Sequence, residues 1–206
     1  MKKFLLVVCV CVFAGSFSYA QDIKFGAKAG LNLSTIVGDD IDNADMKAGL
    51  YFGGFMNVSL NDRLSFQPEL LYSVQGAKDE YKEEDFSYEE TMKLSYLNIP
   101  LLLKMSLGAS NRVHIYAGPQ LGFLLDAESD YEEVDYSGSY SGTEDIKDYI
   151  NSFEFSLNLG LSFNVSDNLS LDVRYNRGLS NIFDNDGDED IKAYNSGFQL
   201  GAAYTF

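Results

Sequence analysis

The chain has 206 residues, which fits a single domain. It carries 31 Asp and Glu against 15 Lys and Arg, so its formal net charge at pH 7 is −16. Nucleic-acid binding needs a basic surface that neutralises phosphates, so this charge balance excludes DNA and RNA as partners.

The first twenty residues have the three parts of a secretory signal peptide. Two lysines precede an apolar run over 4–14, and small residues follow up to Ala20. The run is shorter than the ~20 apolar residues of a membrane-spanning helix. The sequence therefore predicts a cleavable signal over 1–20 and a mature domain over 21–206. Both cysteines lie in the apolar run, so the mature chain should contain neither a disulfide nor a Cys-bound metal.

Beyond the signal, eight segments alternate apolar residues with small or polar ones at a period of two. This period is typical of β-strands. The predicted strands are 23–34, 48–60, 64–75, 93–105, 112–125, 152–165, 169–182 and 195–206. The chain shows no helical periodicity, internal repeat or second domain.

The connections between these segments are alternately short and long. Those at 61–63, 106–111 and 166–168 are turn-like. The long ones are 36–47, 77–92, 126–151 and 183–192, and they hold most of the acidic residues. Short turns at one rim and long loops at the other are typical of an outer-membrane barrel with periplasmic turns and extracellular loops.

Alternation alone leaves open which face lines the barrel. A soluble barrel of the calycin type would enclose the apolar face. An eight-stranded barrel, however, has an interior just wide enough for its own side chains or one small ligand. The apolar face is rich in Leu, Ile, Val and Phe, whereas the other face is rich in Gly. The sequence therefore predicts an all-β fold, an eight-stranded antiparallel transmembrane β-barrel whose bulky face meets lipid.

Several segments resemble known outer-membrane proteins. The last strand alternates and ends in Phe206, like the closing strand of outer-membrane barrels. The segments 26–32 (GAKAGLN), 96–104 (YLNIPLLLK), 116–123 (YAGPQLGF) and 174–182 (RYNRGLSNI) resemble strands of the PorT family of outer-membrane β-barrel proteins.

The PorT resemblance implies a small barrel in the outer membrane of a Gram-negative bacterium. Such a protein is exported through the periplasm and inserted by the barrel-assembly machinery, with Phe206 as the assembly signal. The resemblance does not imply one activity. A role in protein secretion is implied only through the member that gave the family its name.

Charged residues also project to the polar face of the predicted strands. They are Lys24, Lys28, Glu69, Lys104, Arg112, His114, Glu154, Asp172 and Arg174. Because an unpaired buried charge is expensive, mixed signs in a narrow lumen predict a network of paired charges that fills it. The alternative is an ion-conducting path, although eight strands leave little room for water.

His114 is the only histidine and the one candidate for catalysis. It follows a short turn, so it should lie near the periplasmic rim, with no obvious Ser or Asp partner at that level. We therefore expect a hydrogen-bonded lumen residue rather than a catalytic group. The sequence predicts no enzyme activity and no cofactor.

The last long loop contains aspartates at alternate positions, like the start of a calcium loop. They are Asp184, Asp186, Asp188 and Asp190. The Gly and Glu that an EF-hand needs at its sixth and twelfth positions are replaced by Glu189 and Asn195. A loose calcium site and a solvated acidic loop remain alternatives.

Tyrosines and a phenylalanine lie among the acids of 77–92 and 126–151. They predict either a binding surface for an extracellular protein or glycan, or a soluble rim in which the strands extend beyond the membrane. The best functional interpretation is a non-enzymatic outer-membrane protein that presents these loops amid lipid and lipopolysaccharide. A component that assists secretion or envelope assembly is the alternative, and a lumenal enzyme is the third.

Overall fold

The computed structural model describes residues 22–38, 44–83, 86–108, 111–136, 138–184 and 192–206. These residues form nine β-strands and one short 3-10 helix. The elements are β1 (Ile23–Gly38), β2 (Asp45–Ser59), β3 (Leu64–Glu83), β4 (Phe86–Leu107), β5 (Val113–Asp135), β6 (Gly138–Asp145), η1 (Lys147–Tyr149), β7 (Phe153–Asn164), β8 (Leu169–Gly178) and β9 (Ala193–Thr205). Within this part of the chain, no helix is long and apolar enough to cross a membrane. The predicted signal peptide lies outside the described residues.

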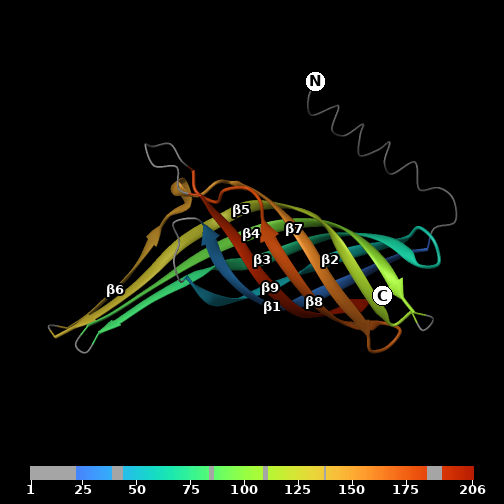
Figure 1. Cartoon of the computed structure of the whole chain (residues 1–206), viewed down its shortest axis with the longest axis horizontal. Helices are drawn as coiled ribbons and strands as arrows, with labels where there is room; N and C mark the ends of the chain where they lie inside the picture. Colours follow the sequence, from blue (N-terminus) through green and yellow to red (C-terminus); the bar gives the residue numbers. More distant parts are fainter. Residues whose placement is uncertain (1–21, 39–43, 84–85, 109–110, 137, 185–191) are drawn as a thin grey trace, which may run out of the picture.

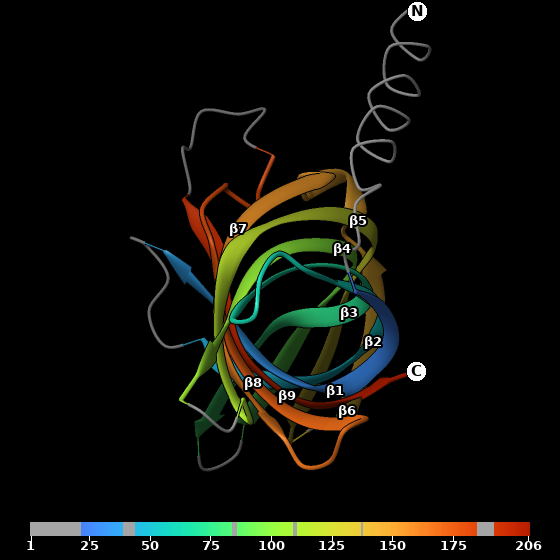
Figure 2. The same ribbon diagram turned by 90° about the vertical axis from the view of Figure 1, so that its right-hand side faces the viewer.

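Eight of the strands close into a barrel (Figures 1 and 2). Their order is β4-β3-β2-β1-β9-β8-β7-β5, every neighbouring pair is antiparallel, and pairing between β4 and β5 completes the ring. Closure pairs the backbone N–H and C=O groups of each strand with both neighbours, which is what a sheet surrounded by hydrocarbon requires. The predicted eight-stranded antiparallel barrel is confirmed.

The three short connections lie at one end of the barrel, beside the C-terminus (Figure 1). The side-chain oxygen of Asn61 accepts hydrogen bonds from the backbone N–H groups of Arg63 and Leu64, and Ser166 does the same for Leu169. Asn and Ser favour turns because they can replace a backbone partner in this way. We call this end the turn end and the opposite end the loop end.

The two faces of the barrel follow the alternation in the sequence. In β9, Phe198, Leu200 and Tyr204 are exposed on the outside, whereas Gln199 and Ala203 are buried in the lumen. A shift of one residue in the pairing would exchange these faces, so the position of the apolar side chains also sets the register. The bulky apolar face points outward, as predicted.

The prediction that 77–92 and 126–151 are loops is wrong for most of their length. β3 and β5 continue beyond the ring, β4 begins outside it, and β6 adds an edge strand. β5 pairs with β7 as far as Phe123 and with β6 from Glu128 onward. The four strands form an antiparallel sheet that extends from the loop end, to the left in Figure 1.

We call residues 78–83, 86–93, 128–135 and 138–145 the projecting sheet. The sequence pattern missed it because a strand is usually recognised by one buried apolar face. Apart from Ser129, the side chains whose exposure is described on both faces of this sheet are wholly or partly exposed, so neither face has to be apolar. Of the two predicted alternatives, the one in which the strands continue as an extended rim fits the geometry of this region, because the strands run on beyond the ring.

Candidate functional site

Four charged side chains meet in the middle of the lumen. The Lys28 ammonium lies 3.3 Å from a Glu69 carboxylate oxygen and 3.0 Å from one of Asp172. Arg174 donates from Nη2 to both carboxylate oxygens of Glu69 at 2.9 Å. All four residues are buried. Two cations and two anions neutralise one another, and this balance is what allows the charges to be buried.

Two tyrosines complete this charged cluster. The Tyr116 hydroxyl donates to Asp172 and accepts a hydrogen bond from Arg174 Nε at 3.3 Å. The Arg174 guanidinium also lies 5.2 Å from the centre of the Tyr116 ring, within the range of a cation–π interaction. Tyr51 lies on the other side of the cluster, with Lys28 Nζ 5.9 Å from its ring centre.

Glycines on the facing strands make room for these rings. Gly160 pairs with Tyr116 across the sheet, and Gly30 pairs with Tyr51. A Cβ atom at Gly160 would overlap the Tyr116 ring, and one at Gly201 would overlap the Tyr51 ring. Gly30, Gly160 and Gly201 on the glycine-rich face therefore leave the space that these two tyrosine rings occupy.

Between the charged cluster and the loop end, further side chains fill the lumen at successive levels. First come amide side chains that bond to one another or to serines, among them Asn32 to Ser73 and Asn176 to Asn158. Next, Asn195 donates to the buried carboxylate of Glu154. The last level is an apolar cluster: Ile36, Ala77, Leu94, Tyr96, Leu124, Ala127, Ile150, Ile182 and Ala193. These levels favour a plugged barrel over an ion-conducting one.

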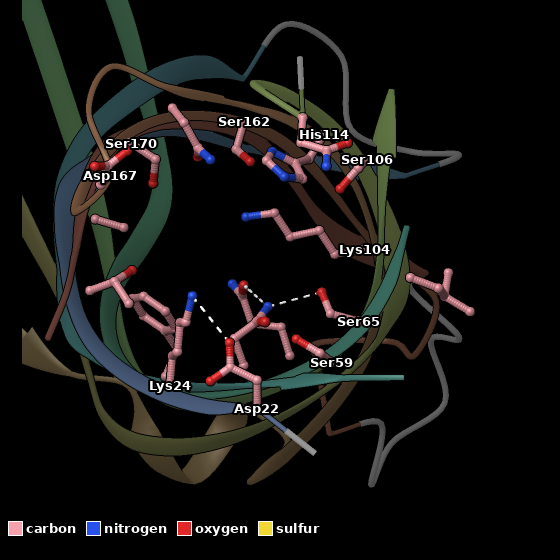
Figure 3. A pocket seen from close by; sticks show the side chains of 18 of the residues that line it. Asp22, Lys24, Ser59, Ser65, Lys104, Ser106, His114, Ser162, Asp167 and Ser170 are labelled. Atoms are coloured by element: carbon pink, nitrogen blue, oxygen red, sulfur yellow. Dashed lines mark hydrogen bonds and ion pairs between the residues drawn. The ribbon is translucent and has the colours of Figure 1, made fainter. Parts of the chain in front are cut away.

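The predicted lumen charges therefore do not form one network. Lys28, Glu69, Asp172 and Arg174 form the charged cluster, and Glu154 lies apart from it near the loop end. Lys104 and His114 line a cavity at the turn end (Figure 3).

Two predicted lumen residues lie at the turn-end rim instead. Arg112 precedes the first residue of β5 and is exposed, so its placement in the lumen is wrong. Lys24 is exposed at the mouth of the cavity, 3.3 Å from Asp22.

His114 has serine neighbours that the sequence analysis did not expect. It pairs with Ser106 on β4 and with Ser162 on β7, and Figure 3 shows both beside the imidazole. Its charged neighbour is Lys104, a cation. A catalytic histidine base is normally oriented by a carboxylate, so this environment does not resemble a hydrolase site.

The lumen tyrosines are the residues that sequence reasoning missed. Tyr51, Tyr96 and Tyr116 are all buried in the lumen, whereas the sequence analysis named only charged residues and His114 as lumen candidates. Their position was readable from the alternation, because Tyr96 and Tyr116 each occupy the parity of the polar face in their strand.

At the loop end, the projecting sheet has two chemically different faces. Directly paired residues of an antiparallel sheet point to the same side, so the register assigns each face. One face continues the lumen side of the barrel and carries Asp79, Tyr81, Glu83, Phe86, Tyr88, Glu90, Tyr131, Glu133, Tyr140 and Glu144. No described position of this face holds a lysine or arginine. We call it the aromatic-acidic face.

The opposite face of the projecting sheet holds all three of its lysines, and each is paired. Lys78 lies 2.9 Å from Glu89, Lys82 contacts Glu80, and Lys93 contacts Asp130. Asp130 also accepts a hydrogen bond from Thr143 at 2.7 Å. The bonds from Lys93 and Thr143 hold the pKa of the Asp130 carboxyl below its ordinary value. This face therefore balances much of its own charge.

On the aromatic-acidic face, by contrast, the partners of Glu83 and Glu90 among the described residues are hydroxyl groups. Glu90 accepts hydrogen bonds from Tyr88 at 2.9 Å and from Ser129 at 2.7 Å, and Glu83 accepts one from Tyr81. The bond to Glu90 raises the pKa of the Tyr88 hydroxyl above its ordinary value. These contacts orient the carboxylates without neutralising them.

The calcium prediction concerns residues that are mostly outside the described chain. Asp186, Asp188 and Asp190 fall in 185–191, whereas Asp184 is described and exposed. Its backbone N–H donates to the Tyr149 carbonyl at 3.0 Å. Among the residues that the structure describes, no group of three or more His, Cys, Asp or Glu could hold a metal ion.

Comparison with known families decides what surrounds the apolar exterior. The sequence model of the outer membrane protein beta-barrel domain matches residues 19–184. The chain belongs to this family. The protein is therefore located in the outer membrane, and the leucines and phenylalanines on the outside of the barrel meet lipid.

Solved structures of other outer-membrane β-barrels are also similar to this family member. Ail, the attachment invasion locus protein of Yersinia pestis, in complex with the heparin analogue sucrose octasulfate, is 14% identical over 90% of this chain and 99% of that chain, with a TM-score of 0.48. Neisserial surface protein A is 15% identical over 88% and 97%, with a TM-score of 0.47. CarO of Acinetobacter baumannii is 14% identical over 86% and 97%, with a TM-score of 0.44. Comparison with curated proteins gave no match.

The C-terminal residue of this outer-membrane barrel makes few contacts. The Phe206 backbone N–H donates to Phe25 at 2.9 Å, and its ring meets Tyr204 edge-on at 5.9 Å, but 76% of the residue is exposed. If Phe206 is the assembly signal that the resemblance implies, its deletion should lower the amount of protein in the outer membrane severalfold. The urea midpoint of the refolded variant should stay close to wild type.

Quantitative immunoblots of outer-membrane fractions would measure the effect of the deletion. Phe198→Ala, which removes a lipid-facing phenylalanine from the same strand, is the control and should not affect delivery to the membrane. Normal outer-membrane levels of the Phe206 deletion would place the assembly signal elsewhere in the chain.

Proposed function

We propose that this protein is a non-enzymatic outer-membrane barrel that binds a basic polypeptide outside the cell through its aromatic-acidic face. The observation that carries the proposal is the distribution of charge on the projecting sheet. All three lysines of the sheet lie on one face and are paired there, while the other face keeps its acids without a cation.

The side chains of the aromatic-acidic face suit lysine and arginine. A carboxylate forms charge-assisted hydrogen bonds with either cation, and a tyrosine or phenylalanine ring attracts it through a cation–π interaction. Tyr81, Tyr131 and Tyr140 are exposed, with 52%, 41% and 59% of their surface accessible. Tyrosine is also favoured in protein interfaces because it adds contact area with few rotatable bonds.

The orientation of the barrel supports an extracellular partner. Barrels of the outer membrane place short turns in the periplasm and long connections outside the cell. The projecting sheet lies at the end opposite the three short turns (Figure 1). Its position thus makes the aromatic-acidic face available to molecules outside the cell.

Two other roles follow from the sequence. The resemblance to the PorT family suggests assistance in secretion or envelope assembly. The expected phenotype would then follow loss of the whole barrel and not changes on one face of the projecting sheet. A lumenal enzyme is less well supported, because His114 is next to a cation and buried side chains fill the lumen beyond the charged cluster.

A matched pair of variants tests the proposed binding face. Glu90→Gln with Glu133→Gln removes two charges from the aromatic-acidic face, whereas Glu89→Gln with Glu132→Gln removes two charges from the opposite face of the same strands. With an oligolysine peptide as the probe, the first pair should weaken binding about tenfold or more, because each charge-assisted hydrogen bond contributes roughly 1.5–3 kcal/mol. The second pair should change binding much less.

Calorimetry on the detergent-solubilised barrel at low salt would measure both affinities. An acidic peptide of equal length should not bind. An equal loss of affinity in both pairs would mean that the peptide senses only net charge, and no binding of oligolysine by the wild type would contradict the proposal.

A further inference from the structure

The lumen opens at the turn end into a cavity of about 800 Å³ (Figure 3). Lys28 and Asp172 of the charged cluster contribute to its lining, and Lys104 and His114 line its wall. Serine and asparagine side chains from several strands line much of the remainder. The volume falls within the range of roughly 300–1,000 Å³ that small-molecule sites occupy.

Lys104 brings into this cavity a charge that no described residue pairs directly. The charged cluster beneath it is already balanced, with Lys28 and Arg174 against Glu69 and Asp172. Lys104 has no hydrogen bond or ion pair with any residue that the structure describes, and Figure 3 shows its side chain extending into the cavity. The other labelled lysine, Lys24, is paired with Asp22 at the mouth.

Asp62, Asp167 and Arg63 also line this cavity, so its wall as a whole carries no surplus of positive charge. Lys104 nevertheless forms no ion pair with the described acids of the lining, because Asp22 contacts Lys24 and Asp172 contacts Lys28. A buried or half-buried ammonium without an anion is unfavourable because it has lost part of its hydration. An anion that enters from the turn end would give the Lys104 ammonium a direct partner.

We infer that the cavity binds a small hydroxylated anion, with Lys104 donating to its charged group. An ammonium offers three donors and forms strong bonds with a carboxylate or phosphate. Most ligand cavities are largely apolar, whereas this wall is rich in hydroxyl and amide groups, which suit a ligand with hydroxyls of its own. A sugar acid or a sugar phosphate free in the periplasm has this chemistry.

This site is at the opposite end of the barrel from the aromatic-acidic face, so the two proposals can fail separately. Ser162 adds to the argument, because its hydroxyl is buried in the same wall without a hydrogen-bond partner among the described residues. His114 Nδ1 is also buried without a hydrogen-bond partner among the described residues. These two atoms lie just beneath the wall surface, so a small rotation of either side chain would offer a ligand a hydrogen bond that the described residues do not use.

His114 also provides a direct readout, since it is the only histidine in the chain. The barrel in neutral detergent would be titrated with glucuronate, glucose 6-phosphate and, as the uncharged counterpart, glucose, while NMR follows the imidazole C–H signals. We expect both anions to shift these signals and glucose to leave them unchanged. Comparison of the two anions tells whether carboxylate or phosphate is preferred.

Variants of Lys104 decide whether its charge is responsible. Lys104→Met should weaken anion binding about tenfold or more, and Lys104→Arg should retain most of it. Lys82→Met, on the projecting sheet at the opposite end of the barrel, is the control and should bind like wild type. Different migration of unboiled and boiled samples in SDS would verify that each variant is folded. Unmoved His114 signals at millimolar anion, or equal binding by wild type and Lys104→Met, would overturn the inference.

Discussion

Replacing Arg174 with methionine should destabilise the barrel by about 3–5 kcal/mol, the usual effect of removing one partner from a buried ion pair. Arg174 is fully buried, holds both carboxylate oxygens of Glu69 and stacks on Tyr116. Without it, the cluster keeps two carboxylates and one ammonium, and Glu69 loses two of its hydrogen bonds. Urea titration of the folded barrel in lipid vesicles would measure the change in the free energy of unfolding.

Two further variants separate charge from volume. Arg63→Met removes an exposed arginine from the first short turn and should change stability by less than about 0.5 kcal/mol. The double variant Glu69→Met with Arg174→Met removes the ion pair as a unit and leaves Lys28 with Asp172. It should recover most of the loss, since apolar residues of similar volume can replace a buried ion pair at little cost. A double variant less stable than Arg174→Met would contradict this account.

Adding one methyl group at Gly160 should also destabilise the barrel, by about 1–3 kcal/mol, the range for overpacked cores. The new Cβ atom would overlap the Tyr116 ring. That ring cannot easily move, because Asp172 and Arg174 both bond to its hydroxyl. Urea titration of Gly160→Ala would measure the effect.

Gly54 provides a matched control, since it is an exposed glycine on the outside of β2. A Cβ atom there would meet nothing nearer than the Gly26 carbonyl at 3.6 Å. Gly54→Ala should therefore be neutral or slightly stabilising. Combining Gly160→Ala with Tyr116→Leu should lose less stability than the two single effects added together. Full additivity would mean that the glycine does not serve to accommodate the ring.

The sequence was sufficient to predict the barrel. Eight alternating segments, three short turns and a bulky apolar face led to the observed strand order and to the outward position of residues such as Leu200. This was possible because a strand between lipid and a narrow lumen has two sharply different faces, so each residue's type reveals its side.

The composition of the lumen could be predicted only in part. Alternation placed four charged residues on the inner face: Lys28, Glu69, Asp172 and Arg174. It did not predict which of them are in contact. The contact between Lys28 and Asp172 joins residues 144 positions apart. It depends on closure of the ring and on the relative heights of the strands. The same closure places Glu154 at a different level and leaves Lys104 without an ion pair among the described residues.

The projecting sheet shows the limit of sequence patterns most clearly. Alternation of apolar and polar residues reveals a strand only when one of its faces is buried. The strands of the projecting sheet are exposed on both faces, so their sequence of acids and tyrosines resembled that of a loop. Their faces are defined by cross-strand pairing alone, which puts Lys93 next to Asp130 and Tyr88 opposite Glu133. One-dimensional hydrophobicity thus determines where this chain meets lipid, whereas the separation of charges into a balanced and an acidic face arises only when the strands pair.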